Sequence, residues 1–410
     1  MSVRLALEFN AQTTDARARE MEQVEKYMRV CIVVHQGFET AVTISPSEPL
    51  LAEAARQYMS ASSLKFNTPA CLLEHWTTMG LGKGDRGELV AQVLMISAAD
   101  KACAEHLNIA HKQFPKPTLG LEQLPYVETA PRAFPVELFI KALLAERWHD
   151  EVFNSLPATW RTDTESRCNF KTAFKNTKVY FTHFIKLDNR AVVNREFLWR
   201  LATRGCIAVC ADGHGSIDII APLVNGTGNL CRSIISALLV QVKNDKNYKA
   251  QPNAILFDLM NPYSVRFFDM DEKNPLPIIR MVFALGSPTS AVRVITQDVE
   301  RHPRTRKAAQ KSPRYTSYDI WCAKASSKTF GVIREEEEQN YALLLKANKV
   351  FPQAYCSKFD REERIGRIMN PGTSVEGAHW AFFGDDKPQL PAVDLADDVD
   401  FGEEDNEVEG

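Results

Sequence analysis

The sequence lacks long hydrophobic runs, a cysteine framework and a leader-like N-terminus. Its longest apolar stretches, such as IISALLVQV, are far too short to cross a bilayer, so we expect no membrane-spanning helix. The first residues, MSVRLALEFN, contain no apolar segment after a basic start, which predicts no secretory signal. The nine cysteines show no disulfide-like spacing, as expected in reducing surroundings. We therefore expect an intracellular protein, in the nucleus or cytoplasm, that does not engage a membrane.

Several catalytic motifs are also missing. There is no G-x-x-x-x-G-K-[ST] phosphate loop, no H-E-x-x-H zinc motif and no G-x-S-x-G nucleophile elbow. Residues 82–87 match G-x-G-x-x-G, but a helical stretch precedes them where a dinucleotide site needs a strand. A glycine-rich loop that caps a helix from Glu88 is the better interpretation.

A zinc site is disfavoured for a similar reason. Its candidate ligands are Cys206, Cys210, His214 and Cys231. They are spread along the chain, whereas structural zinc favours tight C-x₂₋₄-C pairs. Cys206 and Cys210 fall on one face of a predicted strand, which is typical of small core residues.

The charge of the chain is distributed unevenly. The formal net charge is −3, but residues 385–410 hold eleven acidic residues and one lysine and so carry −10, which leaves +7 on the rest. A mildly basic body suits an anionic partner such as nucleic acid, while the dense charge of the tail predicts disorder. Taken alone, the tail is explained most simply as a solubilising segment.

One short segment concentrates positive charge. Residues 301–314 contain six basic residues and no acidic one: Arg301, Arg304, Arg306, Lys307, Lys311 and Arg314. Such a segment contacts a phosphate backbone, acts as a nuclear import signal, or is simply a solvated loop between strands. The first interpretation predicts DNA as a partner, with RNA as the other nucleic acid that fits; the oligomeric state is left open.

At 410 residues, with 45% hydrophobic and 25% charged residues, the chain is expected to fold as an ordinary globular protein. Helical spacing dominates residues 14–113, and five prolines interrupt residues 114–135, which indicates a linker. The predicted regions are a helical N-terminal region (1–125), a connecting helix and strand (126–189), a mixed α/β core (190–345), a C-terminal helical extension (346–384) and a disordered acidic tail (385–410).

Within the core region the predicted order is helix, three strands, crossover, strand. Gly205 is expected to end the first helix, and the last strand can lie parallel to its neighbour because a crossover precedes it. The ranges are a helix at 193–205, strands at 206–210, 216–224 and 235–243, a helical or irregular crossover at 252–269 and a strand at 277–285. Further predicted elements are a helix at 136–153, strands at 177–187 and 291–297, an edge strand at 316–325 and a helix at 335–351.

Two of these strands carry polar residues that an apolar strand does not need. Gln241 and Lys243 point to the same face of strand 235–243, and Asp218 stands among isoleucines in strand 216–224. If the two strands pair, Asp218 lies beside Gln241 and Lys243. A carboxylate, a second oxygen donor and a lysine can bind Mg²⁺ and prepare water for attack on a phosphate.

This arrangement resembles the core of the PD-(D/E)XK, restriction-endonuclease-like nuclease superfamily, with order αβββαβ. The segment GSIDIIAP would supply the aspartate and VQVKN the second motif, in which Gln241 stands where an acidic residue is usual. The segments ISPSEPLLAEAARQYM, GKGDRGELVAQVLM, FLWRLATRG, IDIIAP and LLVQVKND are similar to a fungal family of crinkler-like proteins, over roughly residues 20–290. The resemblance implies a Mg²⁺- or Mn²⁺-dependent nuclease with Asp218 and Gln241 as metal ligands, Lys243 as a catalytic group and a weaker metal site than usual.

The superfamily often adds a glutamate from the helix before the first strand. Glu196 occupies that position. Glu88 is the alternative candidate, although roughly a hundred residues separate it from the strands. The simpler interpretation of each is a solvent-exposed glutamate on a helix. Asn244 and Asp245 are second-line candidates. Two other functions stay open: an inactive nuclease fold that binds nucleic acid or protein, and an interaction domain in which Lys243 only forms an ion pair with Asp218.

Overall fold

The computed structural model describes residues 2–7, 18, 21–22, 24–26, 30–34, 41–44, 49–59, 66–74, 83–113, 133–159, 168–187, 189, 192–210, 216–226, 228–272, 275–296 and 314–346. The helices are α1 (Ser2–Leu5), α3 (Pro49–Met59), α4 (Thr68–Glu74), α6 (Lys83–Gln113), α7 (Val136–Leu143), α8 (His149–Phe153), α9 (Phe170–Ala173), α10 (Arg195–Arg204), α11 (Ala254–Leu259) and α12 (Glu338–Lys346), with 3₁₀ turns at Glu146–Trp148, Arg232–Ile234 and Glu335–Glu337. The strands are β1 (Val30–Val34), β2 (Ala41–Ile44), β3 (Phe134–Pro135), β4 (Thr177–Val179), β5 (His183–Lys186), β6 (Cys206–Val209), β7 (Ile219–Asn225), β8 (Ile235–Lys243), β9 (Ile278–Ala284), β10 (Ala291–Ile295) and β11 (Ser317–Ala323).

The fold is mixed α+β, built on one nine-stranded sheet. Its strand order is β10-β11-β9-β8-β7-β4-β3, and β6 pairs with β5 and with the first residues of β7. Strands β7 and β8 are antiparallel, whereas β8, β9 and β11 run parallel to one another. The predicted order of helix, three strands, crossover and parallel strand is therefore confirmed by α10, β6, β7, β8, α11 and β9.

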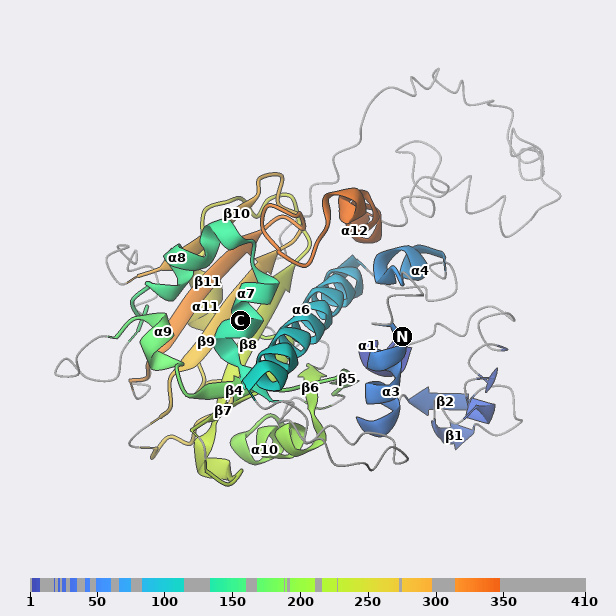
Figure 1. Cartoon of the computed structure of the whole chain (residues 1–410), viewed down its shortest axis with the longest axis horizontal. Coiled ribbons are helices and arrows are strands. Elements are labelled where there is room, and N and C mark those ends of the chain that lie inside the picture. Colours follow the sequence, from blue (N-terminus) through green and yellow to red (C-terminus); the bar gives the residue numbers. More distant parts are fainter. Residues whose placement is uncertain are drawn as a thin grey trace, which may run out of the picture. The chain divides into compact units, whose positions relative to one another are not determined.

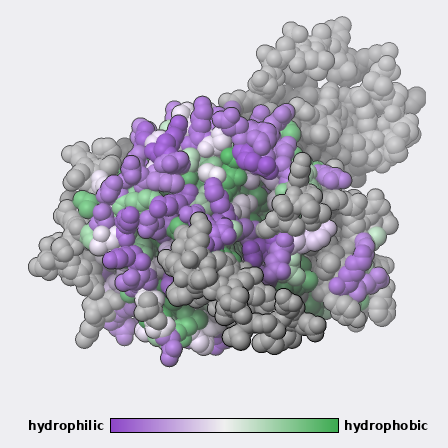
Figure 2. All heavy atoms as spheres, viewed as in Figure 1, coloured by the Kyte–Doolittle hydropathy of each residue, from purple (hydrophilic) through white to green (hydrophobic). Residues whose placement is uncertain are grey.

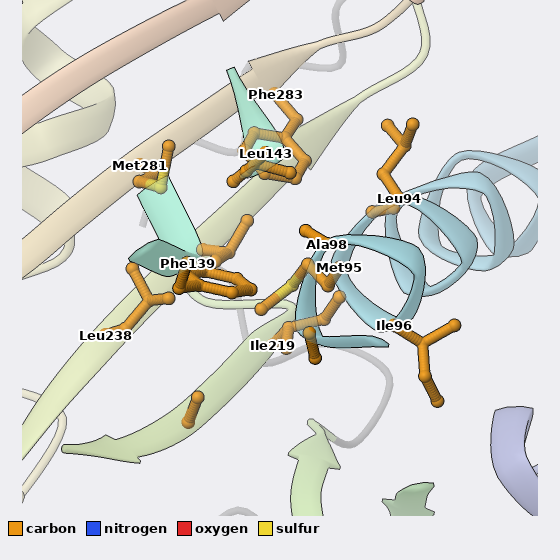
Figure 3. Packing of buried hydrophobic residues seen from close by; sticks show 14 of the residues in the cluster. Leu94, Met95, Ile96, Ala98, Phe139, Leu143, Ile219, Leu238, Met281 and Phe283 are labelled. Carbon is orange, nitrogen blue, oxygen red and sulfur yellow. The ribbon is translucent and has the colours of Figure 1, made fainter. Parts of the chain in front are cut away.

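Strand β8 lies inside this sheet and has both faces covered. Alternate side chains enter two separate core clusters: Leu238, Val240 and Val242 pack on the side of α6 and α7, and Ala237 and Leu239 pack on the side of α10 and α11. Figure 1 shows α6 and α7 crossing one face of the sheet, and Figure 3 shows their side chains among those of the strands. This double burial explains why β8 is apolar on both faces until Val240.

The predicted helix end at Gly205 is confirmed, and asparagine side chains cap the starts of two helices. Helix α10 begins after Asn194, whose side chain accepts a hydrogen bond from the Phe197 N–H, and it ends at Gly205, which has φ +59°. Asn67 caps α4 by accepting from the Ala70 N–H at 2.9 Å. Polar caps at the start and glycine at the end satisfy backbone groups that a helix leaves open.

Other elements are shorter than expected. The predicted helix 136–153 is broken into α7, a 3₁₀ turn and α8, because the chain is extended at Leu144 and Ala145. The predicted strand 177–187 is split into β4, which is antiparallel to β7, and β5, which is parallel to β6. The β-forming residues were recognised correctly, but their division between two partners depends on the rest of the sheet.

Two further expectations are corrected. Strand β11 was predicted as an edge strand, but it lies between β9 and β10. The N-terminal region, predicted as mainly helical, also contains the antiparallel pair β1 and β2. The long helix α6 of that region packs on the sheet itself. Its Gly87 lies against Val242 of β8 and against Asn244, which directly follows the end of that strand.

Some predictions fall outside the described residues. They concern the linker up to residue 132, most of the basic segment (301–313), and the predicted extension and acidic tail from residue 347 onward. Among the described residues no helix is long and apolar enough to span a membrane. Hydrophilic residues cover most of the coloured surface on the face shown in Figure 2.

Candidate functional site

The candidate site lies where β7 begins and β8 ends. The antiparallel ladder ends with Ile219 paired to Val240, and just beyond it the Asp218 N–H donates to the Val240 carbonyl at 2.9 Å. Extending the register by one residue sets Asp218 opposite Gln241. Asp218 immediately precedes β7, where the sequence predicted it inside the strand. Its carboxylate Oδ2 accepts a hydrogen bond of 2.5 Å from the Val242 N–H. The pairing predicted between the two strands is therefore present, and it brings Asp218 to β8.

Burial controls the ionisation of Asp218. It raises the pKa of this carboxyl above its usual range, against the opposing effects of the Val242 N–H and the positive charge of Lys243. A raised carboxyl pKa means that the charged form is poorly compensated by its surroundings. A cation beside Asp218 would supply that compensation.

Gln241 is the most unusual polar residue of the site. Its side chain is only 2% exposed, and its carbonyl oxygen Oε1 is buried without a hydrogen-bond partner among the described residues. Leaving a buried polar atom unsatisfied costs about 1–3 kcal/mol. An oxygen kept at such a cost, opposite a poorly compensated carboxylate, has the chemistry of a cation or water ligand.

Lys243 completes the strand motif two residues later, on the same face as Gln241. It is half-buried and close enough to lower the pKa of Asp218 by its charge. Within the part of the chain that the structure describes, no ion pair of 4.0 Å or less joins Lys243 to Asp218. Lys243 therefore influences the carboxylate through its field instead of by direct pairing.

Helix α6 brings Glu88 to the same end of the sheet. A Cβ atom on Gly87 would lie 3.0 Å from Asn244 Cβ and 3.2 Å from Val242 Cγ1, so the helix backbone touches the end of β8. Burial is the main cause of the raised pKa of the Cys210 thiol. The charges of Asp218 and Glu88 raise this pKa further, so both carboxylates lie near Cys210. The Cys210 N–H in turn donates to the Asp218 carbonyl at 2.8 Å.

Glu196, the alternative to Glu88, is oriented differently. It is 41% exposed and forms an ion pair of 3.2 Å with Arg200, one turn further along α10. Among the described residues, the printed-length ion pair and hydrogen bonds of the Glu196 carboxylate are all made to Arg200. Of the two glutamates considered from the sequence, Glu88 is the one whose charge, with that of Asp218, raises the pKa of the Cys210 thiol.

The remaining candidates have structural partners. Asn244 Nδ2 donates to the Leu345 carbonyl of α12 at 3.1 Å, and Asp245 Oδ1 accepts from the Asn247 N–H at 2.8 Å. Arg314 is exposed, and it is the one described member of the basic segment. Arg301, Arg304, Arg306, Lys307 and Lys311 lie outside the described residues.

The competing motifs find ordinary explanations. Cys206 and Cys210 are buried in the core as predicted, and the described residues include no cluster of three histidine, cysteine or acidic side chains suited to a metal; His214 is not among them. Residues 83–87 already belong to α6, so the helix begins five residues before Glu88, where a capping loop was expected. The preceding described element is helix α4.

The sequence analysis missed one buried ion pair. Arg280 of β9 and Asp319 of β11 are directly paired in the parallel ladder, and their side chains are fully buried with a contact of 2.5 Å. Arg280 also donates to the Tyr315 hydroxyl at 2.9 Å. The signal was available in the sequence, since each of these charges interrupts an apolar run of residues, as Asp218 does. Because both partners are satisfied, the pair is structural.

Comparison with known proteins gives one match. A family model described as "Domain of unknown function (DUF8736)" matches residues 5–134, which is less than half of the chain. No curated protein and no solved structure matches the sequence. The matched region contains α6 and therefore Glu88, whereas Asp218, Gln241 and Lys243 lie outside it.

Proposed function

We propose that this protein is a metal-dependent phosphodiesterase that hydrolyses DNA, built on a core of the PD-(D/E)XK type as in crinkler-like proteins. One observation carries the proposal. Gln241 Oε1 is buried without a hydrogen-bond partner among the described residues, beside the buried Asp218 carboxylate, and Lys243 lies on the same face of β8 as Gln241. The order and pairing of α10, β6, β7, β8, α11 and β9 agree with the αβββαβ core of that superfamily.

The donor atoms fit Mg²⁺ or Mn²⁺. Magnesium prefers a few protein oxygens and retains several waters, and Asp218 and Gln241 supply two such oxygens. The neutral Gln241 removes one negative charge from the usual set, and Glu88 from α6 provides a carboxylate nearby. Asp218 and Gln241 would hold the ion, and Glu88 would contribute charge to it.

The metal and the residues around it would have separate roles in hydrolysis. The bound metal would polarise the phosphate and lower the pKa of a coordinated water. Lys243 would stabilise the negative charge that develops on the phosphate and orient the attacking water. The Val242 N–H fixes the direction of the Asp218 carboxylate through its hydrogen bond. These roles assign no step to Glu196, whose carboxylate is paired with Arg200.

DNA is proposed as the substrate because of the charge of the chain. Residues 1–384 carry +7 of formal charge when the acidic tail is excluded from the net −3, and six basic residues lie within 301–314. A polyanion gains affinity from such a distribution through counterion release.

The second candidate function is a nuclease fold that binds nucleic acid or a protein without cutting. One observation favours it: the described residues contain no group of three acidic, histidine or cysteine side chains arranged for a metal. With Gln241 in place of an acid, loss of the metal would leave a binding surface without catalysis.

DNA cleavage separates the two functions. Purified protein is incubated with plasmid and linear DNA in Mg²⁺ or Mn²⁺, beside Asp218→Ala and Lys243→Ala, with the exposed Lys249→Ala as a matched control. We expect cleavage by the wild type and the control, and a loss of about 100-fold or more in the two site variants. Equal residual cleavage by all four proteins would indicate a contaminant and overturn the assignment. No cleavage, with salt-sensitive DNA binding retained, would favour the binding module.

A further inference from the structure

Three buried polar atoms without partners belong to two neighbouring side chains, those of Arg195 and Tyr263. Arg195 is the first residue of α10, and its side chain is only 12% exposed. Its Nε and Nη2 atoms are buried and have no hydrogen-bond partner among the described residues. The same is true of the hydroxyl of Tyr263, a residue that is 5% exposed. Buried donors are almost always paired in native proteins, so three orphans in one place indicate a partner from outside the chain.

One aromatic ring holds the two side chains together. The centroid of the Phe268 ring lies 5.1 Å from Arg195 Cζ and 5.6 Å from the centroid of the Tyr263 ring. Burial raises the pKa of the Tyr263 hydroxyl, which the charge of Glu272 raises further and that of Arg195 lowers, so both charges lie near the hydroxyl. A phenol with a raised pKa stays protonated at neutral pH, and Tyr263 is therefore a hydrogen-bond donor.

The surroundings of Arg195 leave one edge of its guanidinium free. Nη1 forms an ion pair of 2.6 Å with Glu272 Oε1. The rings of Phe267 and Phe268 lie against the group, with centroids 5.8 and 5.1 Å from Cζ. The remaining edge carries Nε and Nη2, whose two parallel N–H groups match two oxygens of a carboxylate or a phosphate.

We propose that Arg195 and Tyr263 form a binding site for an oxyanion, a phosphate or carboxylate group. The Nε–Nη2 edge of Arg195 donates to two of its oxygens, and the Tyr263 hydroxyl donates to one of them. Glu272 fixes the guanidinium in this orientation through Nη1, and its side chain is 16% exposed, so the site lies just beneath the surface. A small molecule or a chain end reaches such a covered edge, whereas the backbone of a duplex does not. The inference goes beyond the proposed function and does not depend on the proposed metal site.

Isothermal titration calorimetry of the full chain with inorganic phosphate, and separately with acetate, tests the site. Arg195→Lys keeps the charge that pairs with Glu272 and removes the two-donor edge, and Tyr263→Phe removes the hydroxyl alone. The matched controls are Arg200→Lys, 67% exposed on the same helix, and Tyr58→Phe, 64% exposed on α3. We expect the wild type and both controls to bind, with a loss of about 10–100-fold in each site variant, the range for hydrogen bonds to a charged group.

Thermal melts without added anion separate binding from folding. Tyr263→Phe removes a buried, unsatisfied hydroxyl, so its melting temperature should equal or exceed that of the wild type. A lower melting temperature would show that the hydroxyl is already satisfied in the free protein and would overturn its role in the site.

The two anions distinguish the source of the oxygens. Tighter binding of phosphate supports a phosphorylated ligand, and tighter binding of acetate supports a carboxylate. Wild-type affinity in both site variants would overturn the inference, because the anion would then bind elsewhere. No binding of either anion by the wild type would also overturn it and would leave the proposed metal site standing, since that site is tested by DNA cleavage.

Discussion

At the scale of single residues, the polar side chains within apolar segments could be identified from the sequence alone. The two-residue period of a strand is sufficient to place Gln241 and Lys243 on one face, and the pairing register places Asp218 opposite. Glu88 could not be chosen over Glu196 in this way, because its approach depends on the packing of α6 over the sheet. That Gln241 Oε1 has no hydrogen-bond partner among the described residues likewise depends on the folded structure and not on the local sequence.

Gln241→Glu tests whether the neutral amide limits metal binding. The variant restores a second carboxylate opposite Asp218, and the added negative charge should strengthen Mn²⁺ binding by about tenfold or more, equivalent to about 1.4 kcal/mol. In EDTA the same variant should melt at a lower temperature than the wild type, because two buried carboxylates face each other without a cation. Calorimetry and thermal melts measure the two effects. Unchanged affinity would mean that residue 241 does not face the ion.

The ionisation of Asp218 predicts a pH dependence of stability in the metal-free protein. Its pKa in the folded state is raised by burial, above the value near 3.9 expected in an unfolded chain. The stability that this carboxyl contributes is therefore fully present below about pH 3.9 and is lost as the pH rises through the folded-state pKa.

Asp218→Asn removes that loss and retains an acceptor for the Val242 N–H. Melts in EDTA should show the variant unfolding at a higher temperature than the wild type at pH 7, with a difference that narrows toward pH 4. The exposed Asp271→Asn is the matched control and should follow the wild type at every pH. A variant less stable than the wild type at pH 7 would contradict the assigned cause of the shift.

At the scale of elements, prediction succeeded where a segment has one partner and one period. The bounds of β8 and the end of α10 at Gly205 follow from the sequence pattern and from the φ of +59° that glycine accepts. Residues 177–187 form one β-prone run, yet the structure divides them into β4, which pairs with β7, and β5, which pairs with β6. The position of β11 between β9 and β10 also depends on the whole sheet, since the sequence of a strand does not determine whether it pairs on one side or on both.

Gly87→Ala tests the contact between α6 and β8. In a solvated helix this change would stabilise by about 1 kcal/mol, but here the new Cβ would lie 3.0 Å from Asn244 Cβ, so one element must move. We expect a loss of about 1–3 kcal/mol in the free energy of unfolding, measured in urea, together with weaker Mn²⁺ binding as Glu88 withdraws. Gly228→Ala, whose added Cβ would meet no atom within 4 Å, is the control. A gain in stability would show that α6 does not press on β8.

At the scale of the whole molecule, the candidate site joins parts of the chain that are far apart in sequence. Helix α6 belongs to the region matched as a domain of unknown function, and it lies in the same compact unit as the sheet that carries Asp218 and Gln241. Gly87, in the predicted N-terminal region, thus contacts Val242, in the predicted core, so the two regions pack against each other. Segment boundaries drawn from composition do not reveal contacts of this kind.

The charge asymmetry of the chain predicts an effect of the acidic tail on DNA binding. Deleting residues 385–410 removes −10 and changes the formal net charge from −3 to +7. If the tail competes with DNA for the basic body, the shortened protein should bind DNA more tightly at low salt, and the difference should fade at high salt. Fluorescence anisotropy across a salt series measures this. Equal affinities at low salt would remove the competition.

The central claim is that Asp218 and Gln241 together hold a divalent cation, and anomalous scattering from crystals grown with Mn²⁺ tests it most directly. We expect one strong anomalous peak in contact with the Asp218 carboxylate and with Gln241 Oε1, and its absence from crystals of Asp218→Asn prepared in the same way. No peak at this position in the wild type, with both side chains ordered, would contradict the account.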